Sequence, residues 1–274
     1  MKLLNGKELG EFIKERQARQ VRGLRQAEHI APTLAIIQTT DNPVIDTYVR
    51  MKKRYGDDIL VDVVVHRIAS DELFSVIEKC NRDDSVQGII IQLPLEDETQ
   101  TEDALNHVKP EKDVDGLGKS ALFTPATPMA IDWLLSGYNV DLHGKKIAIV
   151  GNGRLVGAPL AKLWQNAGHS VTVFDESTSH MLGELVHYDI IVTAAGVPGL
   201  ITSQSLRPGA VVVDAATSSE HGKLLGDVAG DVRERTDITI TPEKGGVGPL
   251  TVCALFDNVI RSARMRAEAL KKTA

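Results

Sequence analysis

The chain has 274 residues, of which 42% are hydrophobic and 25% are charged, and its formal net charge is −6. This composition is typical of a globular protein with a sizeable buried core, and the length accommodates two domains. The acidic balance argues against a nucleic-acid partner, because only the short basic run Arg50–Arg54 offers a patch of cations.

Membrane, disulfide and metal chemistry are also not indicated. No apolar run has the length of a membrane-spanning helix, and the charged start MKLLNGKELG lacks the apolar centre of a signal peptide. Cys80 and Cys253 lie far apart and predict no disulfide framework, which favours a cytoplasmic location. The histidines show no metal-site spacing. We therefore expect no membrane partner and no metal.

In chain order, the first half alternates strands and helices after a long polar N-terminal helix. Strands are expected at 33–38, 59–68 and 86–91, with helices around 45–55 and 70–82. Short β-branched runs bounded by turns are typical of parallel strands buried on both faces. The segment 109–128 then breaks the alternation with proline, glycine and charge, which indicates a domain boundary.

A second α/β series follows this boundary. Its expected strands are 145–150, 170–175, 189–196, 211–216 and a weaker one at 237–242, before a long helix that runs to the C-terminus. Alternating strands and helices predict an α/β fold made of two doubly wound parallel-sheet domains.

Three glycines stand between an apolar strand and a helix in the stretch IVGNGRLVGAPL, residues 149–160. Gly151, Gly153 and Gly157 let the backbone approach an anion, which the free N–H groups at the helix start attract. The spacing G-x-G-x-x-x-G departs from the stricter dinucleotide fingerprint, and a tight turn that binds nothing is the alternative. The surrounding strand–helix–strand order favours cofactor binding.

Two acids, Asp175 and Glu176, end the strand that follows this helix. An acid about 20 residues beyond the glycines usually binds the 2′-hydroxyl of the adenosine ribose. The negative charge would repel a 2′-phosphate, so the pair favours NAD over NADP. Two solvated acids that cap the next helix are the alternative. Arg154 either turns toward a phosphate or faces solvent.

Polar residues also follow the strands of the first half. Tyr48 and Lys52 lie four apart on one helix face, and Gln92 ends the third strand. Asp113 and Asp115 occupy the next connection. Each has a bland interpretation as a solvated lysine, a strand-end cap or a turn former. Because carboxyl ends of parallel strands share one edge, their convergence favours a ligand site.

The motifs YVRMK, GIIIQLPL, KDVDG, TPATP, VGNGRLVGAP and TPEKGGVGPLT occur in this order. The chain from about residue 33 to 262 resembles the methylenetetrahydrofolate dehydrogenase–methenyltetrahydrofolate cyclohydrolase family. The resemblance implies a folate-binding catalytic domain, 1–120 plus 250–274, and a Rossmann-type dinucleotide-binding domain, 121–249, with a cleft between them. It also implies a homodimer.

Site residues follow from the resemblance. Lys52 would be the cyclohydrolase acid/base, Gln92 would orient and tune it, Tyr48 would stack on the folate and Asp115 would bind the pterin edge. The turn that lines the cleft near the pterin would be Gly246, Val247, Gly248 and Pro249. The cofactor-binding residues would be Gly151, Asn152, Gly153, Arg154, Gly157, Asp175, Glu176 and Gly196.

The implied reactions are oxidation of 5,10-methylenetetrahydrofolate to the methenyl form, with hydride transfer to NAD or NADP, and hydrolysis to 10-formyltetrahydrofolate. This is one-carbon metabolism that supplies purine biosynthesis. Hydride transfer depends on positioning, whereas hydrolysis needs a proton acceptor. A lysine serves if desolvation and neighbouring cations lower its pKa.

The cofactor side departs most from the family pattern. Asn152 and Gly153 stand where the family has arginine and serine, and Asp175 and Glu176 replace its histidine and serine. In the folate half, Ile45 replaces a serine. These differences leave two alternatives open: an enzyme with cyclohydrolase activity alone, and a non-catalytic folate- or nucleotide-binding protein.

Overall fold

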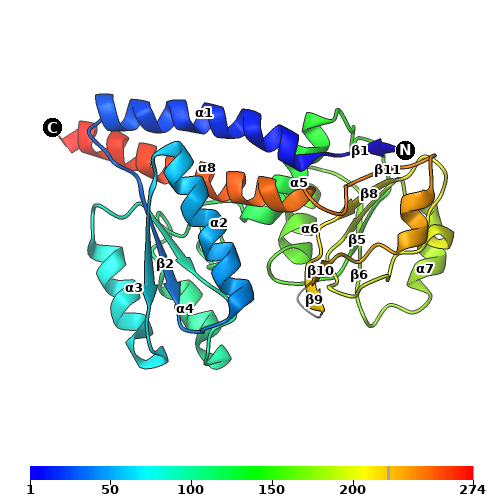
Figure 1. The fold of residues 1–274 in the computed structure, drawn as a ribbon, viewed down its shortest axis with the longest axis horizontal. Coiled ribbons are helices and arrows are strands. Elements are labelled where there is room, and N and C mark those ends of the chain that lie inside the picture. Colours follow the sequence, from blue (N-terminus) through cyan, green and yellow to red (C-terminus); the bar gives the residue numbers. More distant parts are fainter. Residues whose placement is uncertain (221–222, 274) are drawn as a thin grey trace. The chain divides into compact units, whose positions relative to one another are not determined.

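The structure is a computed structural model that describes residues 1–220 and 223–273. The chain forms two compact units, one of Met1–Gly10 with Thr127–Thr251 and one of Glu11–Ala126 with Val252–Ala274. We call them the six-stranded unit and the three-stranded unit, after their main sheets. The long helices α1 (Gly6–Ala27) and α8 (Val247–Thr273) each begin in the six-stranded unit and end in the three-stranded unit (Figure 1).

The three-stranded unit is built on a parallel sheet with the order β3–β2–β4. Its strands and the helices between them are β2 (Thr33–Gln38), α2 (Pro43–Ile59), β3 (Asp62–Arg67), α3 (Leu73–Arg82) and β4 (Gly88–Ile91). The chain leaves β2 toward β3 on one side and then crosses β2 to place β4 on the other. The connections that follow β2 and β4 therefore diverge at one point of the carboxyl edge, where ligands bind in open parallel sheets.

Helices cover both faces of this sheet. One face packs against α3 and α4 (Thr101–His107) through a buried cluster that includes Ala35, Ile37, Leu73, Ile77, Ile89, Ile91 and Leu105. On the other face, a Cβ placed on Gly88 would lie 3.1 Å from Cγ2 of Val259 in α8. Helix α1 joins α8 through the buried Gln17, whose Nε2 donates to the carbonyl of Cys253 over 2.8 Å.

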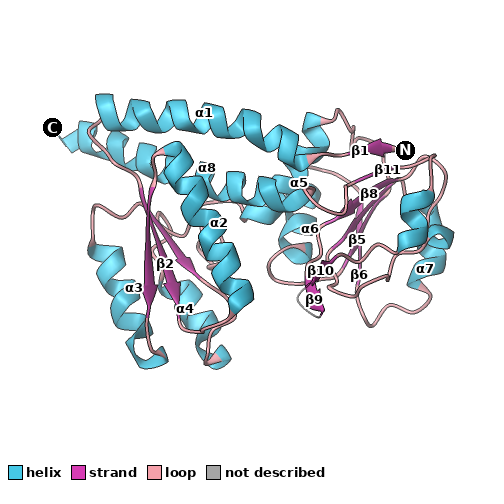
Figure 2. Cartoon of the chain, viewed as in Figure 1, coloured by secondary structure: helices cyan, strands magenta, loops and turns pink. Residues whose placement is uncertain are grey.

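The six-stranded unit has a parallel sheet with the order β1–β11–β8–β7–β5–β6, drawn in magenta in Figure 2. The strands are β1 (Lys2–Leu3), β5 (Ile147–Val150), β6 (Val171–Phe174), β7 (Ile190–Thr193), β8 (Val211–Asp214) and β11 (Thr239–Ile240). The helices that lie wholly or mostly within this unit are α5 (Ala126–Gly137), α6 (Gly157–Asn166) and α7 (Met181–Glu184). A hairpin of β9 (Ser218–Glu220) and β10 (Lys223–Leu225) follows β8.

The strand order of this unit also contains a reversal. Strand β5 pairs with β6 on one side and with β7 on the other, so the connections after β5 and β7 diverge. Hydrophobic residues of the sheet, among them Ala148, Val150, Ile191 and Val212, form one buried cluster with Leu185, Ile201 and Val232. The reversal between β5 and β7 is the expected ligand position in a sheet of this kind.

The predicted α/β class, with parallel sheets in two domains, is confirmed. The expected strand at 59–68 is shorter, because α2 extends to Ile59 and is followed by Leu60, whose φ is 65°. Strand β1 was not predicted. Because it pairs with β11, residues 1–10 belong to the six-stranded unit, whereas the sequence placed them with the first domain.

Within the described residues, no helix combines the length and apolarity that crossing a membrane requires. The same part of the chain holds no group of three or more His, Cys, Asp or Glu side chains arranged to bind a metal ion.

Candidate functional site

The first candidate site lies at the carboxyl edge of the three-stranded sheet. Lys52, from α2, donates a hydrogen bond from Nζ to Oε1 of Gln92 over 2.9 Å. Gln92 follows β4 directly, and its backbone N–H donates to the carbonyl of Ile37 over 2.8 Å. Its side-chain Nε2 donates to the carbonyl of Leu93 over 3.2 Å, which directs Oε1 toward the lysine. Two residues forty positions apart thus meet where the connections after β2 and β4 diverge.

In the motif KDVDG, two polar residues, Lys112 and Asp113, stabilise the loop, and the third, Asp115, lies near Lys52. The buried Lys112 donates from Nζ to the carbonyls of Cys80 and Asp83, at the end of α3, over 2.9 and 2.6 Å. Asp113 accepts the N–H groups of Gly116 and Gly118 over 3.0 and 2.8 Å. Both side chains therefore hold the loop in shape, and Asp113 has a structural role.

The loop places Asp115 within electrostatic reach of Lys52. Gly116 has a φ of 71°, and a Cβ on it would lie 2.6 Å from the carbonyl oxygen of Phe123, so no other residue fits there. Helix α8 contributes Asn258, a residue that the sequence analysis missed. Its Nδ2 donates to the carbonyls of Val114 and Thr124, each over 2.9 Å, and so fixes the loop from both sides.

The electrostatics of this site are those of a half-buried amine near a carboxylate. Burial lowers the pKa of Lys52, and the negative charge of Asp115 partly opposes this effect. Burial raises the pKa of Asp115, and the positive charge of Lys52 opposes that shift. Lys52 is therefore a stronger candidate for proton transfer than a lysine in water. Desolvation, which the sequence analysis expected to act together with neighbouring cations, is the cause of the lowered pKa.

The remaining predicted folate residues fall in both units. Tyr48 lies one helical turn before Lys52 on α2 and is half-buried. Gly246, Val247, Gly248 and Pro249 belong to the six-stranded unit, where they form the entry into α8. Gly246 and Val247 are buried, whereas Gly248 is exposed.

The second candidate site is the glycine turn after β5. Gly151 has a φ of 100°, and a Cβ on it would lie 2.6 Å from the carbonyl oxygen of Ala194 in the connection after β7. A Cβ on Gly157 would lie 1.8 Å from the carbonyl oxygen of Gly151. Both glycines are thus required by contacts within the protein.

No contact within the described part of the protein requires glycine at position 153. No described atom outside its chain neighbours lies within 4 Å of a Cβ placed on it, and the residue is exposed. Val156, which precedes α6, makes no side-chain capping hydrogen bond. Asn152 and Arg154 are exposed on either side. An open backbone before an uncapped helix start fits a phosphate group, so this turn suits the pyrophosphate of a dinucleotide.

The predicted acids lie at the end of β6, beside this turn, because the N–H of Gly151 donates to the carbonyl of Phe174 over 2.7 Å. Oδ1 of Asp175 accepts the N–H and hydroxyl of Ser177 over 3.0 and 2.6 Å. These hydrogen bonds lower the pKa of Asp175, so its carboxylate is charged at neutral pH. Glu176 is exposed.

Gly196, the last predicted cofactor residue, lies in the exposed connection after β7 and has a φ of 71°. The buried Asp227 accepts hydrogen bonds from this connection, and Asp214, at the end of β8, supports Asp227. Sequence analysis missed both aspartates. A signal existed for Asp214, because it follows a buried β-branched run at the carboxyl edge of the sheet.

The contact between Lys52 and Asp115 yields a test. Asp115→Asn removes the negative charge that favours protonated Lys52, so the pKa of Lys52 is expected to fall further. NMR titration of the Lys52 side chain measures this directly. Asp57→Asn, on the exposed side of α2, makes the same change in net charge and is expected to leave the pKa of Lys52 unchanged. An unchanged or raised pKa in Asp115→Asn would contradict the geometry.

Comparisons with known proteins cover both units. The catalytic domain of the tetrahydrofolate dehydrogenase/cyclohydrolase family matches residues 4–115, and its NAD(P)-binding domain matches residues 125–267. The bifunctional protein FolD of Staphylococcus saprophyticus is 36% identical over 97% of this chain and 98% of its own length.

Solved structures agree with these matches. The bifunctional FolD of Campylobacter jejuni is 35% identical, covers 97% of this chain and 99% of its own, and has a TM-score of 0.91. The FolD of Trypanosoma brucei, solved with NADP and an inhibitor, is 28% identical, covers 96% and 97%, and has a TM-score of 0.89. The resemblance predicted from the motifs is confirmed. The chain belongs to the bifunctional tetrahydrofolate dehydrogenase/cyclohydrolase family, as an oxidoreductase and hydrolase with a catalytic domain and an NAD(P)-binding domain.

Proposed function

We propose that the three-stranded unit binds 5,10-methylenetetrahydrofolate beside Lys52 and that the six-stranded unit binds the dinucleotide at its glycine turn. When bound there, NAD or NADP would supply the acceptor for a hydride from the methylene carbon. The chain then hydrolyses the resulting methenyl cation to 10-formyltetrahydrofolate. The observation that supports this proposal best is the hydrogen bond from Lys52 to Gln92, at a half-buried position where the sheet topology directs ligands.

The hydride transfer step needs orientation more than proton transfer. A folate nitrogen lone pair supplies the electrons that replace the departing hydride, so no side chain has to exchange a proton. We infer that Tyr48 stacks on the folate ring system and that Asp115 accepts a hydrogen bond from the pterin edge. We also infer that the turn Gly246-Val247-Gly248-Pro249 contacts the pterin.

Hydrolysis of the methenyl cation needs a base. As water adds to the bridging carbon, neutral Lys52 accepts one of its protons. The protonated lysine then delivers a proton to the folate nitrogen whose bond to that carbon breaks. The hydroxyl becomes the formyl oxygen as its proton leaves to solvent, so one proton is released overall. Gln92 holds the lysine amine in place through Oε1. The lowered pKa of Lys52 keeps more of the neutral amine available near neutral pH.

The two activities are expected to separate in one variant. Lys52→Ala should lower the rate of methenyl hydrolysis by about 10²–10⁴-fold, the usual effect of a lost general base, and leave hydride transfer within roughly threefold of wild type. Hydrolysis is followed by loss of methenyl absorbance and hydride transfer by formation of the reduced dinucleotide.

The exposed neighbour Lys53 provides the matched control, and Lys53→Ala should retain both rates. Equal loss of both activities in Lys52→Ala would contradict the separate roles. Wild-type protein that hydrolyses the methenyl compound but reduces no dinucleotide would establish the cyclohydrolase-only alternative. Absence of both activities would favour a non-catalytic binding protein.

We infer that NAD is the preferred cofactor. The family relative from Trypanosoma brucei holds NADP, so membership of the family does not decide the choice. In this chain the carboxylate of Asp175 is charged and stands at the end of β6, next to the glycine turn. A second negative charge at the adenosine 2′ position would be repelled there, whereas a 2′-hydroxyl can donate a hydrogen bond to the carboxylate.

Cofactor preference is tested by kcat/KM with each dinucleotide. Wild-type protein should favour NAD, and Asp175→Ser should reduce the ratio of NAD to NADP by about one order of magnitude, because the repulsion is removed. Glu176→Gln, at the exposed neighbouring position, should change the ratio less. A higher kcat/KM with NADP for the wild type would overturn the inference.

We also propose that the chain is a cytoplasmic homodimer that supplies 10-formyltetrahydrofolate for purine biosynthesis. In support of the dimer, β3 is an edge strand of its sheet, and Val64 on β3 and the adjoining Leu60 are each 44% exposed. An edge strand with exposed apolar side chains is a usual site of pairing.

Light scattering after size exclusion is expected to give twice the mass of one chain. Val64→Lys should shift the protein toward the monomer, because the substitution places a charge within the proposed interface. As a control, Thr172→Lys introduces the same charge at an exposed strand position in the six-stranded unit and should leave the dimer intact. A monomeric wild type at micromolar concentration would contradict the proposal.

A further inference from the structure

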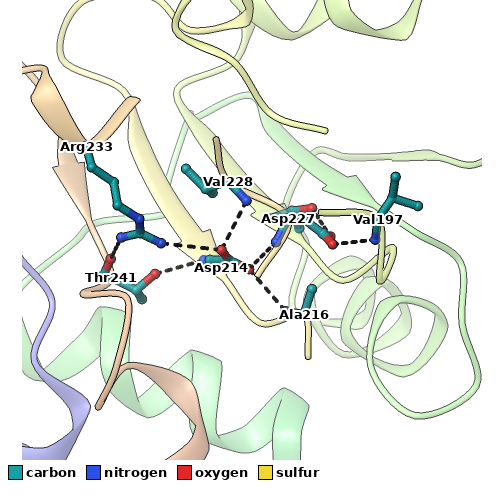
Figure 3. A network of polar contacts seen from close by, with 8 residues as sticks. Val197, Asp214, Ala216, Asp227, Val228, Arg233 and Thr241 are labelled. Carbon is teal, nitrogen blue, oxygen red and sulfur yellow. Dashed lines mark hydrogen bonds and ion pairs between the residues drawn. The ribbon is translucent and has the colours of Figure 1, made fainter. Parts of the chain in front are cut away.

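The connection after β7 is held by a buried carboxylate. Ala195, Gly196 and Val197 are exposed, and Val197 is 50% exposed, yet the backbone of this segment is tied to a residue with no exposed surface. Asp227 accepts the N–H of Val197 at Oδ1 over 2.7 Å (Figure 3). It also accepts the N–H of Ala195 at Oδ2 over 2.8 Å. The hydroxyl of Thr193, the last residue of β7, also donates to Oδ2.

Asp227 is itself anchored to the end of β8. Its N–H donates to Oδ1 of Asp214, and the N–H of Val228 donates to Oδ2 of Asp214, each over 3.2 Å. Arg233 lies 3.6 Å from the same Oδ2 and donates to the carbonyl of Thr241 (Figure 3). A Cβ on Gly226 would lie 2.0 Å from Oδ2 of Asp214. A larger residue at position 226 would therefore displace the Asp214 carboxylate.

These contacts link the carboxyl ends of three strands, β8, β7 and β5, one to the next. Asp214 on β8 fixes the segment 226–228, and Asp227 in that segment fixes the connection after β7. That connection in turn touches the glycine turn after β5, because Ala194 donates its N–H to the carbonyl of Val150 over 2.8 Å and its own carbonyl oxygen closes on Gly151. The fixed connection therefore forms one side of the reversal between β5 and β7, where a dinucleotide is expected.

The position of the connection indicates which half of the cofactor it serves. The adenosine half is assigned to Asp175 at the end of β6, on one side of β5, and the pyrophosphate to the turn after β5. The connection after β7 lies on the opposite side of β5. A dinucleotide laid across the strand ends in this order reaches the connection after β7 with its nicotinamide half.

We propose that Asp227 is a positioning residue that holds residues 195–197 in the conformation required by the nicotinamide riboside half of the dinucleotide. The inference rests on the proposed cofactor site at the glycine turn. A charged acceptor for two backbone N–H groups makes strong hydrogen bonds, and its loss leaves both amides without that partner. An exposed connection of this kind then becomes mobile, and binding has to order it again.

Amide hydrogen exchange of the protein without ligand tests the positioning directly. Asp227→Asn should increase exchange at the amides of Ala195 and Val197 by about tenfold or more, because a side-chain amide replaces the charged double acceptor. Asp231→Asn is the matched control, since Oδ2 of Asp231 also accepts a backbone N–H, that of Ser203, over 3.0 Å. The control should leave exchange at residues 195 and 197 unchanged.

Binding measured by calorimetry then identifies the half of the cofactor concerned. Asp227→Asn should weaken the affinity for NAD by about tenfold or more, and leave the affinity for ADP, which lacks the nicotinamide riboside, within roughly twofold of wild type. Methenyl hydrolysis, assigned to the three-stranded unit, should be retained. If Asp227→Asn does not fold, Thr193→Val removes one of the three donors to Asp227 and should produce the same changes to a smaller extent.

The outcomes separate the inference from the proposal on which it rests. Wild-type protein that binds neither NAD nor NADP would contradict the proposed cofactor site. Wild-type protein that binds NAD with the same affinity as Asp227→Asn, or an equal loss of ADP and NAD affinity in the variant, would overturn the role of Asp227. Unchanged amide exchange at residues 195 and 197 in Asp227→Asn would also overturn the role of Asp227.

Discussion

Parallel strand pairing is the constraint on which both candidate sites depend. In each sheet all the strands point the same way, so their carboxyl ends gather at one edge. Each sheet also contains a strand from which the chain proceeds first to one side and later to the other. At such a point two connections diverge and leave room for a ligand. Lys52 and Gln92 occupy the reversal in one unit, and Gly151 and Gly157 occupy it in the other.

Lys52, the proposed catalytic base, is subject to two opposing electrostatic influences. Burial favours its neutral form, which is the form that accepts a proton, while the charge of Asp115 favours the protonated form. Gln92 contributes a neutral acceptor that fixes the amine without adding a second negative charge. In the proposed mechanism, burial therefore keeps neutral Lys52 available as a base, and the charge of Asp115 stabilises the protonated lysine that later donates its proton. Lys112 and Asp113, although equally polar and close in sequence, are used to build the loop.

The proposed cofactor site differs from the lysine site, because the groups exposed at its glycine turn are largely backbone. Contacts within the protein fix the conformation of this backbone. Gly151 and Gly157 are small because other backbone atoms occupy the space of a Cβ, whereas Gly153 leaves its space open. The buried Asp227 holds peptide groups of the exposed connection after β7, and Asp214 in turn holds the segment that carries Asp227. Departures from the family pattern at exposed positions such as Asn152 are compatible with this frame, since the buried contacts do not involve them.

The sequence alone predicted the α/β class, most of the strands and the convergence of Lys52, Gln92 and Asp115 at one edge of a sheet. It could do so because β-branched runs, glycine turns and polar residues at strand ends are local patterns. Tertiary structure decided the rest. Strand β1 is only two residues long and exists because β11 lies beside it, and Asn258 and Asp227 act on segments far away in the chain. Their partners are set by packing, which no local pattern encodes. The lowered pKa of Lys52 has the same origin, because burial is a property of the folded chain and not of its neighbours in sequence.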